Sequence, residues 1–168
     1  MEGWGERGAL QKGKIRLGCM ENEPMVARFL YDRDYHQWIQ ETVEALRNRD
    51  FHEIDWDHLI EELESMGKND KRALISLLTR LLEHLLKLKY WQAEKERCSH
   101  HWSAEIVNFR AQIEYRLEDS PSLRSQLPLL YDKAYPVALK SVSKLFDLPE
   151  DAEISLSQVL DEDWFGES

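Results

Sequence analysis

Four side chains that could hold an anion recur at helical spacing in the middle of the sequence. In chain order they are Arg80, His84, Lys87 and Trp91. Because they follow one another in steps of four, three and four residues, a helix would place them along one ridge. A guanidinium, a titratable imidazole and an ammonium on one ridge could bind a phosphate or a carboxylate. This basic ridge is therefore a candidate anion or partner site, and Arg97 and Trp102 are candidates to extend it.

The basic ridge also has a plainer interpretation, as a contact that stabilises the fold. An acidic motif precedes it and contains the glutamates Glu61, Glu62 and Glu64. Ionic contacts between neighbouring helices are common on helical proteins, so these carboxylates are candidate partners of the ridge. Both interpretations remain open at the level of sequence.

The acidic motif does not predict a metal site. On a helical wheel Glu62 and Glu64 flank an apolar stripe on opposite sides, and Glu61 points away from both. A di-metal bundle would also need Glu-x-x-His pairs, which this sequence lacks. The adjacent histidines His100-His101 match no standard zinc spacing. We therefore expect neither a metal nor a cofactor.

The basic ridge lies beside the strongest periodic signal of the chain. Leucines recur at steps of three and one over residues 69–91 and predict a helix with a wide apolar face, buried against at least two neighbours. These leucines are Leu74, Leu77, Leu78, Leu81, Leu82, Leu85 and Leu86. Such a helix should form the centre of the fold.

Five other helices are predicted around this central one. They cover residues 34–47, 56–66, 100–118, 128–146 and 155–160. Asp55 is a good N-cap for the helix that begins at Trp56, and Gly67 stands where a left-handed cap would end that helix or a kink would bend it. Since no strand alternation is present, we predict an all-α fold, an antiparallel bundle of four to five helices with a short C-terminal closing helix.

Length and composition set further limits. A chain of 168 residues favours one domain, so we expect a flexible leader over residues 1–24 and a single helical bundle domain over residues 25–168. No apolar run is long enough to span a membrane. The two cysteines fit a reducing cytoplasm. The net charge of −10 disfavours binding to nucleic acid or anionic lipid.

Several segments of the sequence resemble a known family. They are Tyr31-Asp32-x-Asp34-Tyr35-x-x-Trp38, Asp55-Trp56-x-x-Leu59-x-Glu61-Glu62-x-Glu64-x-x-Gly67, His84-Leu85-Leu86-Lys87, Ser120-Pro121-Ser122-Leu123 and Leu160-Asp161-x-Asp163. Together they resemble the family called domain of unknown function 29 over about residues 31–165, and residues 90–108 are similar to its cyanobacterial members. The resemblance implies an all-helical fold and a bacterial cytosolic protein. It implies no established activity, and therefore no catalytic residues.

The function predicted from these patterns is a non-enzymatic adaptor or regulator that binds another protein. No spacing gathers the polar groups that catalysis would need. The partner would bind the basic ridge or the acidic strip that begins at Asp147. The alternative is a nucleic-acid-binding or RNA-cleaving protein that uses the basic ridge. Association between copies of the chain is left open.

Overall fold

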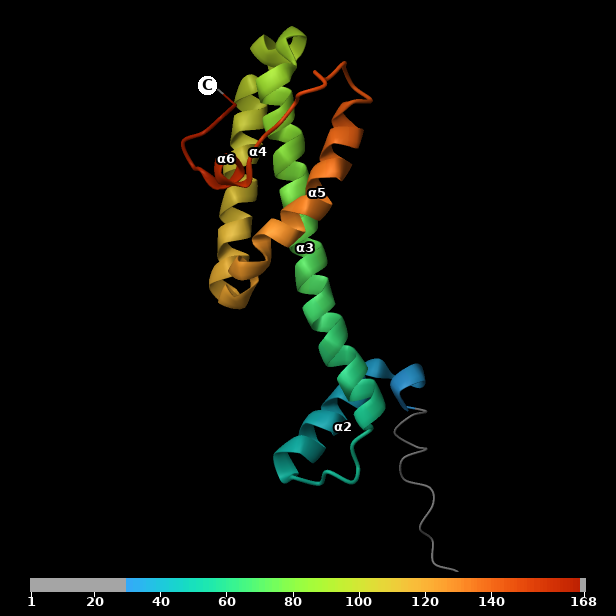
Figure 1. Ribbon diagram of the computed structural model, residues 1–168. Helices are drawn as coiled ribbons and strands as arrows, with labels where there is room; N and C mark the ends of the chain where they lie inside the picture. The colour runs from blue at the N-terminus through green and yellow to red at the C-terminus, as the bar shows by residue number, and fades with distance from the viewer. Residues whose placement is uncertain (1–29, 167–168) are drawn as a thin grey trace, which may run out of the picture. The chain divides into compact units, whose positions relative to one another are not determined.

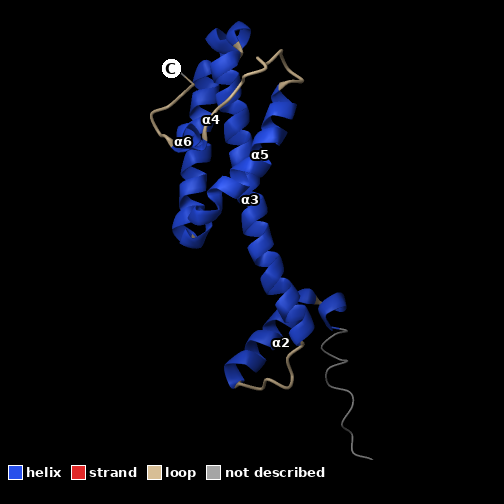
Figure 2. Cartoon of the chain, viewed as in Figure 1, coloured by secondary structure: helices blue, strands red, loops and turns tan. Residues whose placement is uncertain are grey.

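The computed structural model describes residues 30–166, in which all regular structure is helical (Figures 1 and 2). The all-α prediction is confirmed. The described residues divide into two compact units, residues 30–62 and residues 63–166. The leader predicted over residues 1–24 lies outside the described part of the chain. Between residues 30 and 166 no helix is both long and apolar enough to cross a membrane.

In the first unit, α2 covers Tyr35–Asn48, close to the predicted range of 34–47. The side chain of Asp34 caps this helix, because its Oδ1 accepts a hydrogen bond from the backbone N–H of Gln37 at 3.0 Å. The helix ends at Arg49, whose φ of 64° is left-handed and whose N–H bonds back to the last turn. A short loop then leads to Asp55 and the next helix.

Helix α3 covers Trp56–Tyr90 and contributes its first turns to the first unit and the rest to the second. Its start is as predicted, since the Oδ1 of Asp55 accepts from the N–H of His58 at 3.4 Å. The prediction that Gly67 ends this helix is wrong, because the helix continues through it as one element of 35 residues. A mid-helix glycine costs only about 1 kcal/mol relative to alanine, and the many Leu, Glu, Lys and Arg residues elsewhere in α3 favour the helix.

The second unit is built around the leucines of α3. Six of the seven predicted leucines are fully buried, and Leu77 is half-buried. They pack in one core cluster with side chains of α4 (Gln92–Asp119), the short helix η1 (Pro121–Gln126) and α5 (Leu127–Val142). Figure 1 shows α4 running back along this part of α3, with α5 beside them. The predicted burial of the leucine face is confirmed.

Helix α4 begins eight residues before the predicted start at His100. Ser99, directly before the predicted start, therefore lies inside the helix. Residues 92–99 are mostly polar helix formers, which continue a helix by propensity but carry no apolar period. A prediction based on hydrophobic spacing cannot detect such a segment.

The C-terminal residues of the second unit pack against its core. Helix α6 (Leu156–Leu160) begins with a capping box, in which Ser155 and Gln158 each bond to the backbone of the other. Val159 is fully buried, and Trp164 and Phe165 pack against the core cluster. The short closing helix was predicted over residues 155–160 and is confirmed.

Candidate functional site

The first two members of the basic ridge differ in accessibility. Arg80 is exposed, whereas His84 is half-buried on α3. The Nδ1–H of His84 donates to the carbonyl oxygen of Arg80 at 2.8 Å, and its ring lies 5.6 Å from the ring of Phe109 on α4. Burial lowers the pKa of His84 below its ordinary value of 6.5. The imidazole is thus held in a packed, neutral state.

The aromatic members of the candidate site take part in core packing. Trp91 stacks on Trp102, with ring centroids 5.8 Å apart, and on Phe146 at 5.0 Å. Trp102 is buried and Trp91 is half-buried. Arg97 is exposed, and its Nη1 lies 3.7 Å from Oε2 of Glu94 in the same helix. Lys87 is partly exposed. The two tryptophans are therefore not offered to a partner alongside the cations.

Two of the three candidate glutamates have partners outside the basic ridge. Glu62 accepts hydrogen bonds from two tyrosines, and Glu64 forms an ion pair with Lys68 at 3.0 Å. Glu61 is exposed. The pairing of Glu61, Glu62 and Glu64 with the basic ridge stays a prediction.

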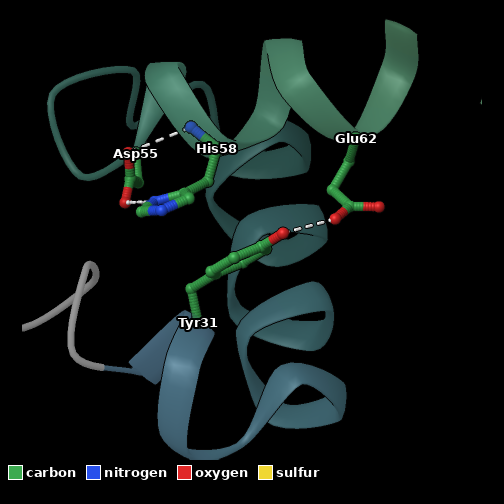
Figure 3. Close-up of polar contacts among 4 residues, drawn as sticks. All are labelled: Tyr31, Asp55, His58 and Glu62. Carbon is green, nitrogen blue, oxygen red and sulfur yellow. Dashed lines mark hydrogen bonds and ion pairs between the residues drawn. The ribbon is translucent and has the colours of Figure 1, made fainter. Parts of the chain in front are cut away.

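A polar cluster joins the start of the described chain to α3 within the first unit (Figure 3). The hydroxyl of Tyr31 donates to Glu62 at 2.6 Å, and the ring of Tyr31 stacks on the ring of His58 at 4.0 Å. The Nδ1 of His58 is 2.6 Å from Oδ2 of Asp55. Tyr35 adds a second hydroxyl to Glu62 at 2.8 Å. The cluster thus ties residues 31–35 to residues 55–62 at the start of α3.

Electrostatics within the cluster follow from these hydrogen bonds. The bond to Glu62 raises the pKa of Tyr31 to about 12, because losing the proton would set two negative charges against each other. The same bond and that from Tyr35 lower the pKa of Glu62 below its ordinary 4.5. The carboxylate is therefore ionised and the phenols are protonated at neutral pH.

The geometry of the polar cluster favours a structural role, in which it holds chain segments together, over a catalytic role. Asp55 orients the imidazole of His58, as the acid of a catalytic triad would. However, within residues 30–166 the side-chain hydrogen bond of His58 is to Asp55, and none joins His58 to a serine, threonine or cysteine. The same part of the chain has no group of three or more His, Cys, Asp or Glu side chains arranged to hold a metal ion. The cluster fixes residues 30–35 against the first turns of α3.

An apolar strip lies exposed in the first unit and consists of Phe51, Trp56 and Ile60. Their side chains are 53%, 46% and 54% exposed. The indole N–H of Trp56 donates to the carbonyl oxygen of Phe51 at 3.1 Å, which holds the loop beside the helix. Trp56 and Ile60 are one helical turn apart and share a face of α3. Leu63 and Met66, later on α3, are exposed as well.

Sequence reasoning did not predict the polar cluster, although it named Asp55 as an N-cap and Glu62 as a candidate acidic partner. The Asp55-x-x-His58 spacing, one turn apart at a helix start, was a usable signal for the polar cluster. Arg110 was missed too, although it stands between Ile106 and Ile113 on the inward face of α4. A charged residue inside an apolar stripe is itself a signal of a buried polar contact.

Comparison with known proteins places the chain in a family without assigning it an activity. No curated protein and no solved structure matches it. A family model does match, that of Domain of unknown function DUF29, and it covers residues 30–165. The matched range includes α2 to α6 and both the polar cluster and the apolar strip. The chain therefore belongs to the DUF29 family.

Proposed function

We propose that this protein is a non-enzymatic adaptor or regulator whose first unit binds a basic, amphipathic helix of another protein. The observation that carries the proposal is the exposure of apolar side chains in that unit. Over residues 30–62, seven large apolar side chains are exposed, and three hydrophobic residues are buried. The exposed ones are Tyr35, Ile39, Val43, Leu46, Phe51, Trp56 and Ile60. An excess of exposed over buried large apolar side chains is unusual for a folded unit, and exposed apolar surface is a mark of interaction sites.

The exposed side chains are ordered along two helices. On α2, Ile39, Val43 and Leu46 follow one another in steps of four and three and so form a second strip. The apolar strip of Phe51, Trp56 and Ile60 runs along the first turns of α3. A partner helix laid on such a surface would use apolar anchors spaced by three and four residues.

The negative charge of the first unit predicts which charged residues its partner carries. Residues 30–62 contain ten acidic side chains and three arginines. Negative charge around an apolar surface favours a partner that carries lysine or arginine beside its apolar anchors, and it repels acidic partners. The same charge opposes contact with the phosphates of nucleic acid.

A panning experiment tests the proposal. A displayed library of 16-residue peptides is selected against the full-length protein. We expect enriched peptides to be basic and to carry apolar residues at helical spacing. Binding should fall at least tenfold when Phe51 and Ile60 are both changed to Ala, because the apolar anchors lose their contact area.

The control changes two apolar side chains that are equally exposed in the second unit. They are Leu129 and Val137 on α5, and changing both to Ala should leave peptide binding unaltered. The proposal would be overturned if the library yielded no binder, if the enriched peptides were acidic or lacked apolar periodicity, or if both double variants bound them equally well.

A further inference from the structure

Residues 60–72 of α3 form a helical stretch that is exposed almost throughout. Eleven of these thirteen residues are exposed, and on α3 the buried core cluster begins only at Leu74. Ile60 and Leu63 are 54% and 60% exposed, and an added Cβ at Gly67 would meet no atom within 4 Å. Helices in proteins gain most of their stability by packing an apolar face against a neighbour. Among the described residues, this stretch has little such packing.

The exposed stretch carries an apolar line, formed by Ile60, Leu63 and Gly67. These residues follow one another in steps of three and four, so they lie along one side of the helix. Leu74 and Leu81 continue the line at steps of seven and are fully buried in the core. An apolar line with this period is the packing surface that a helix offers to a second helix in a coiled coil. We therefore looked at the charges that flank it.

Four charged side chains lie on one flank of the apolar line. They are Glu61, Glu64, Lys68 and Lys71, at steps of three, four and three. Glu64 and Lys68 form an exposed ion pair within the helix at 3.0 Å, which contributes only a few tenths of a kcal/mol. Within residues 30–166, neither Glu61 nor Lys71 forms an ion pair. The flank is thus acidic at its first half and basic at its second.

From this order of charges we infer that α3 pairs with α3 of a second copy of the chain, in an antiparallel dimer. In an antiparallel pair, the same flank of both helices meets. A two-fold axis at Met66 sets each residue opposite the one equally far beyond the axis. Glu64 then faces Lys68 of the second copy, and Glu61 faces Lys71. By symmetry each contact occurs twice, whereas a parallel pair would set acid against acid.

The charge order also explains why a second copy is the best occupant of this face. A helix that is acidic or basic throughout would meet like charge along half of the flank. The complement is a helix with the reversed order of charges, which is α3 itself turned end for end. Asp70 lies across the apolar line from this flank and outside these pairs.

The inference goes beyond the proposed function and does not rest on it. Ile60 belongs to both the apolar line and the apolar strip, so the dimer and a partner helix would compete there. A contact along a few turns of one helix is small, which predicts a dissociation constant on the order of micromolar. Unfolding measured well below that concentration reports the single chain.

Sedimentation velocity of the full-length protein over a range of concentrations tests the inference. The wild type should form a dimer as the concentration rises. Glu61→Lys with Glu64→Lys makes the flank wholly basic, and Lys68→Glu with Lys71→Glu makes it wholly acidic. Each double variant should dimerise at least tenfold more weakly, because like charges then face each other.

Mixing the two double variants in equal amounts should restore a dimer of near wild-type affinity, because a basic flank then meets an acidic one. A variant with all four changes reverses the order of charges and should also dimerise. This recovery shows that the double variants are folded. The controls carry the same changes in net charge at exposed sites on other helices, and they should dimerise like the wild type. They are Glu41→Lys with Glu44→Lys on α2 and Lys133→Glu with Lys140→Glu on α5.

Three outcomes would overturn the inference. They are a wild type that stays monomeric up to about 1 mM, a dimer that the double variants do not weaken, and a mixture of them that fails to recover. Library peptides bound by a monomeric wild type would overturn this inference alone. A charge-dependent dimer without any library binder would overturn the proposed function alone.

Discussion

Arg110 of α4 donates a hydrogen bond from Nε to the carbonyl oxygen of Val159 in α6, 2.9 Å away. Its other nitrogens donate to the carbonyl oxygens of Gln158, Glu162 and Trp164 at 2.7–3.2 Å. These acceptors include carbonyls that the end of a helix leaves without partners. Burial lowers the pKa of Arg110 relative to its ordinary value, but the guanidinium remains charged at physiological pH. One buried cation thus holds the closing segment.

Replacing Arg110 by Ala should destabilise the second unit by about 3 kcal/mol, because four carbonyl groups lose a charged donor. Arg110→Lys should recover only part of this loss, since an ammonium cannot reproduce the planar fork of donors. Urea unfolding followed by far-UV circular dichroism measures both changes. Equal stability of the lysine variant and the wild type would show that charge alone matters.

The hydrogen bonds to Glu62 predict a pH dependence within the first unit. Its pKa is lowered in the folded protein, so the stabilisation that its carboxylate provides is present above pH 4.5 and is lost as the pH falls through the folded pKa. For Tyr31, whose pKa is raised to about 12, the stabilisation is complete below pH 10 and is lost as the pH rises toward 12.

A ¹³C NMR titration of the Glu62 carboxyl carbon checks the acidic limb. The midpoint should lie below 4.5 in the wild type and should rise toward 4.5 when Tyr31 and Tyr35 are both changed to Phe. The carboxyl of Glu61, titrated in the same spectra, is the reference for an exposed neighbour. An unchanged Glu62 midpoint in the double variant would contradict the assigned cause.

Two glycines should respond in opposite ways to the same substitution. Gly67→Ala should stabilise the protein by about 0.5–1 kcal/mol, because Gly67 lies inside α3 and an added Cβ would meet no atom within 4 Å. Gly166→Ala should destabilise it, since Gly166 has a φ of +82° and an added Cβ would lie 3.1 Å from Cβ of Lys89. Chemical denaturation of both variants provides the comparison.

Two leucines of α3 offer a matched test of the core. Leu85 is fully buried, and Leu85→Ala should lower the free energy of unfolding by about 3 kcal/mol through lost contacts and the cavity left behind. Leu63 is 60% exposed, and Leu63→Ala should change it by about 0.5 kcal/mol or less. Similar losses at both positions, measured by urea unfolding, would contradict the burial described for α3.

The hydrophobic pattern was sufficient to predict the centre of the fold. Residues such as Leu78 and Leu82 recur with the helical period over more than three turns, and burial is the stable outcome for a face that wide. Local capping chemistry was equally informative at Asp55, which acts through a hydrogen bond to a residue three positions away. Such short-range interactions can be predicted from sequence alone.

Interactions between distant segments could not be predicted in this way. The apolar period of Trp56, Ile60 and Leu63 indicates a face on the helix, but the period does not specify what covers that face. The break expected at Gly67 depended on a small difference in propensity, which the continuing helix outweighs.

The candidate site depends on such distant contacts. The partners of Glu62 are 27 and 31 residues away, and those of Arg110 are 48 to 54 residues away. Only folding brings these groups together.

The contact between Arg110 and the closing segment also sets an order of events during synthesis. Translation proceeds from the N-terminus, so α4 emerges from the ribosome well before its four carbonyl acceptors exist. A nascent chain halted before Gln158 would leave this guanidinium without its four carbonyl acceptors, and the core would lack Val159, Trp164 and Phe165, which pack in it or against it. Quality-control chaperones and proteases act on unfinished chains with surfaces of this kind, which would separate truncated molecules from finished ones.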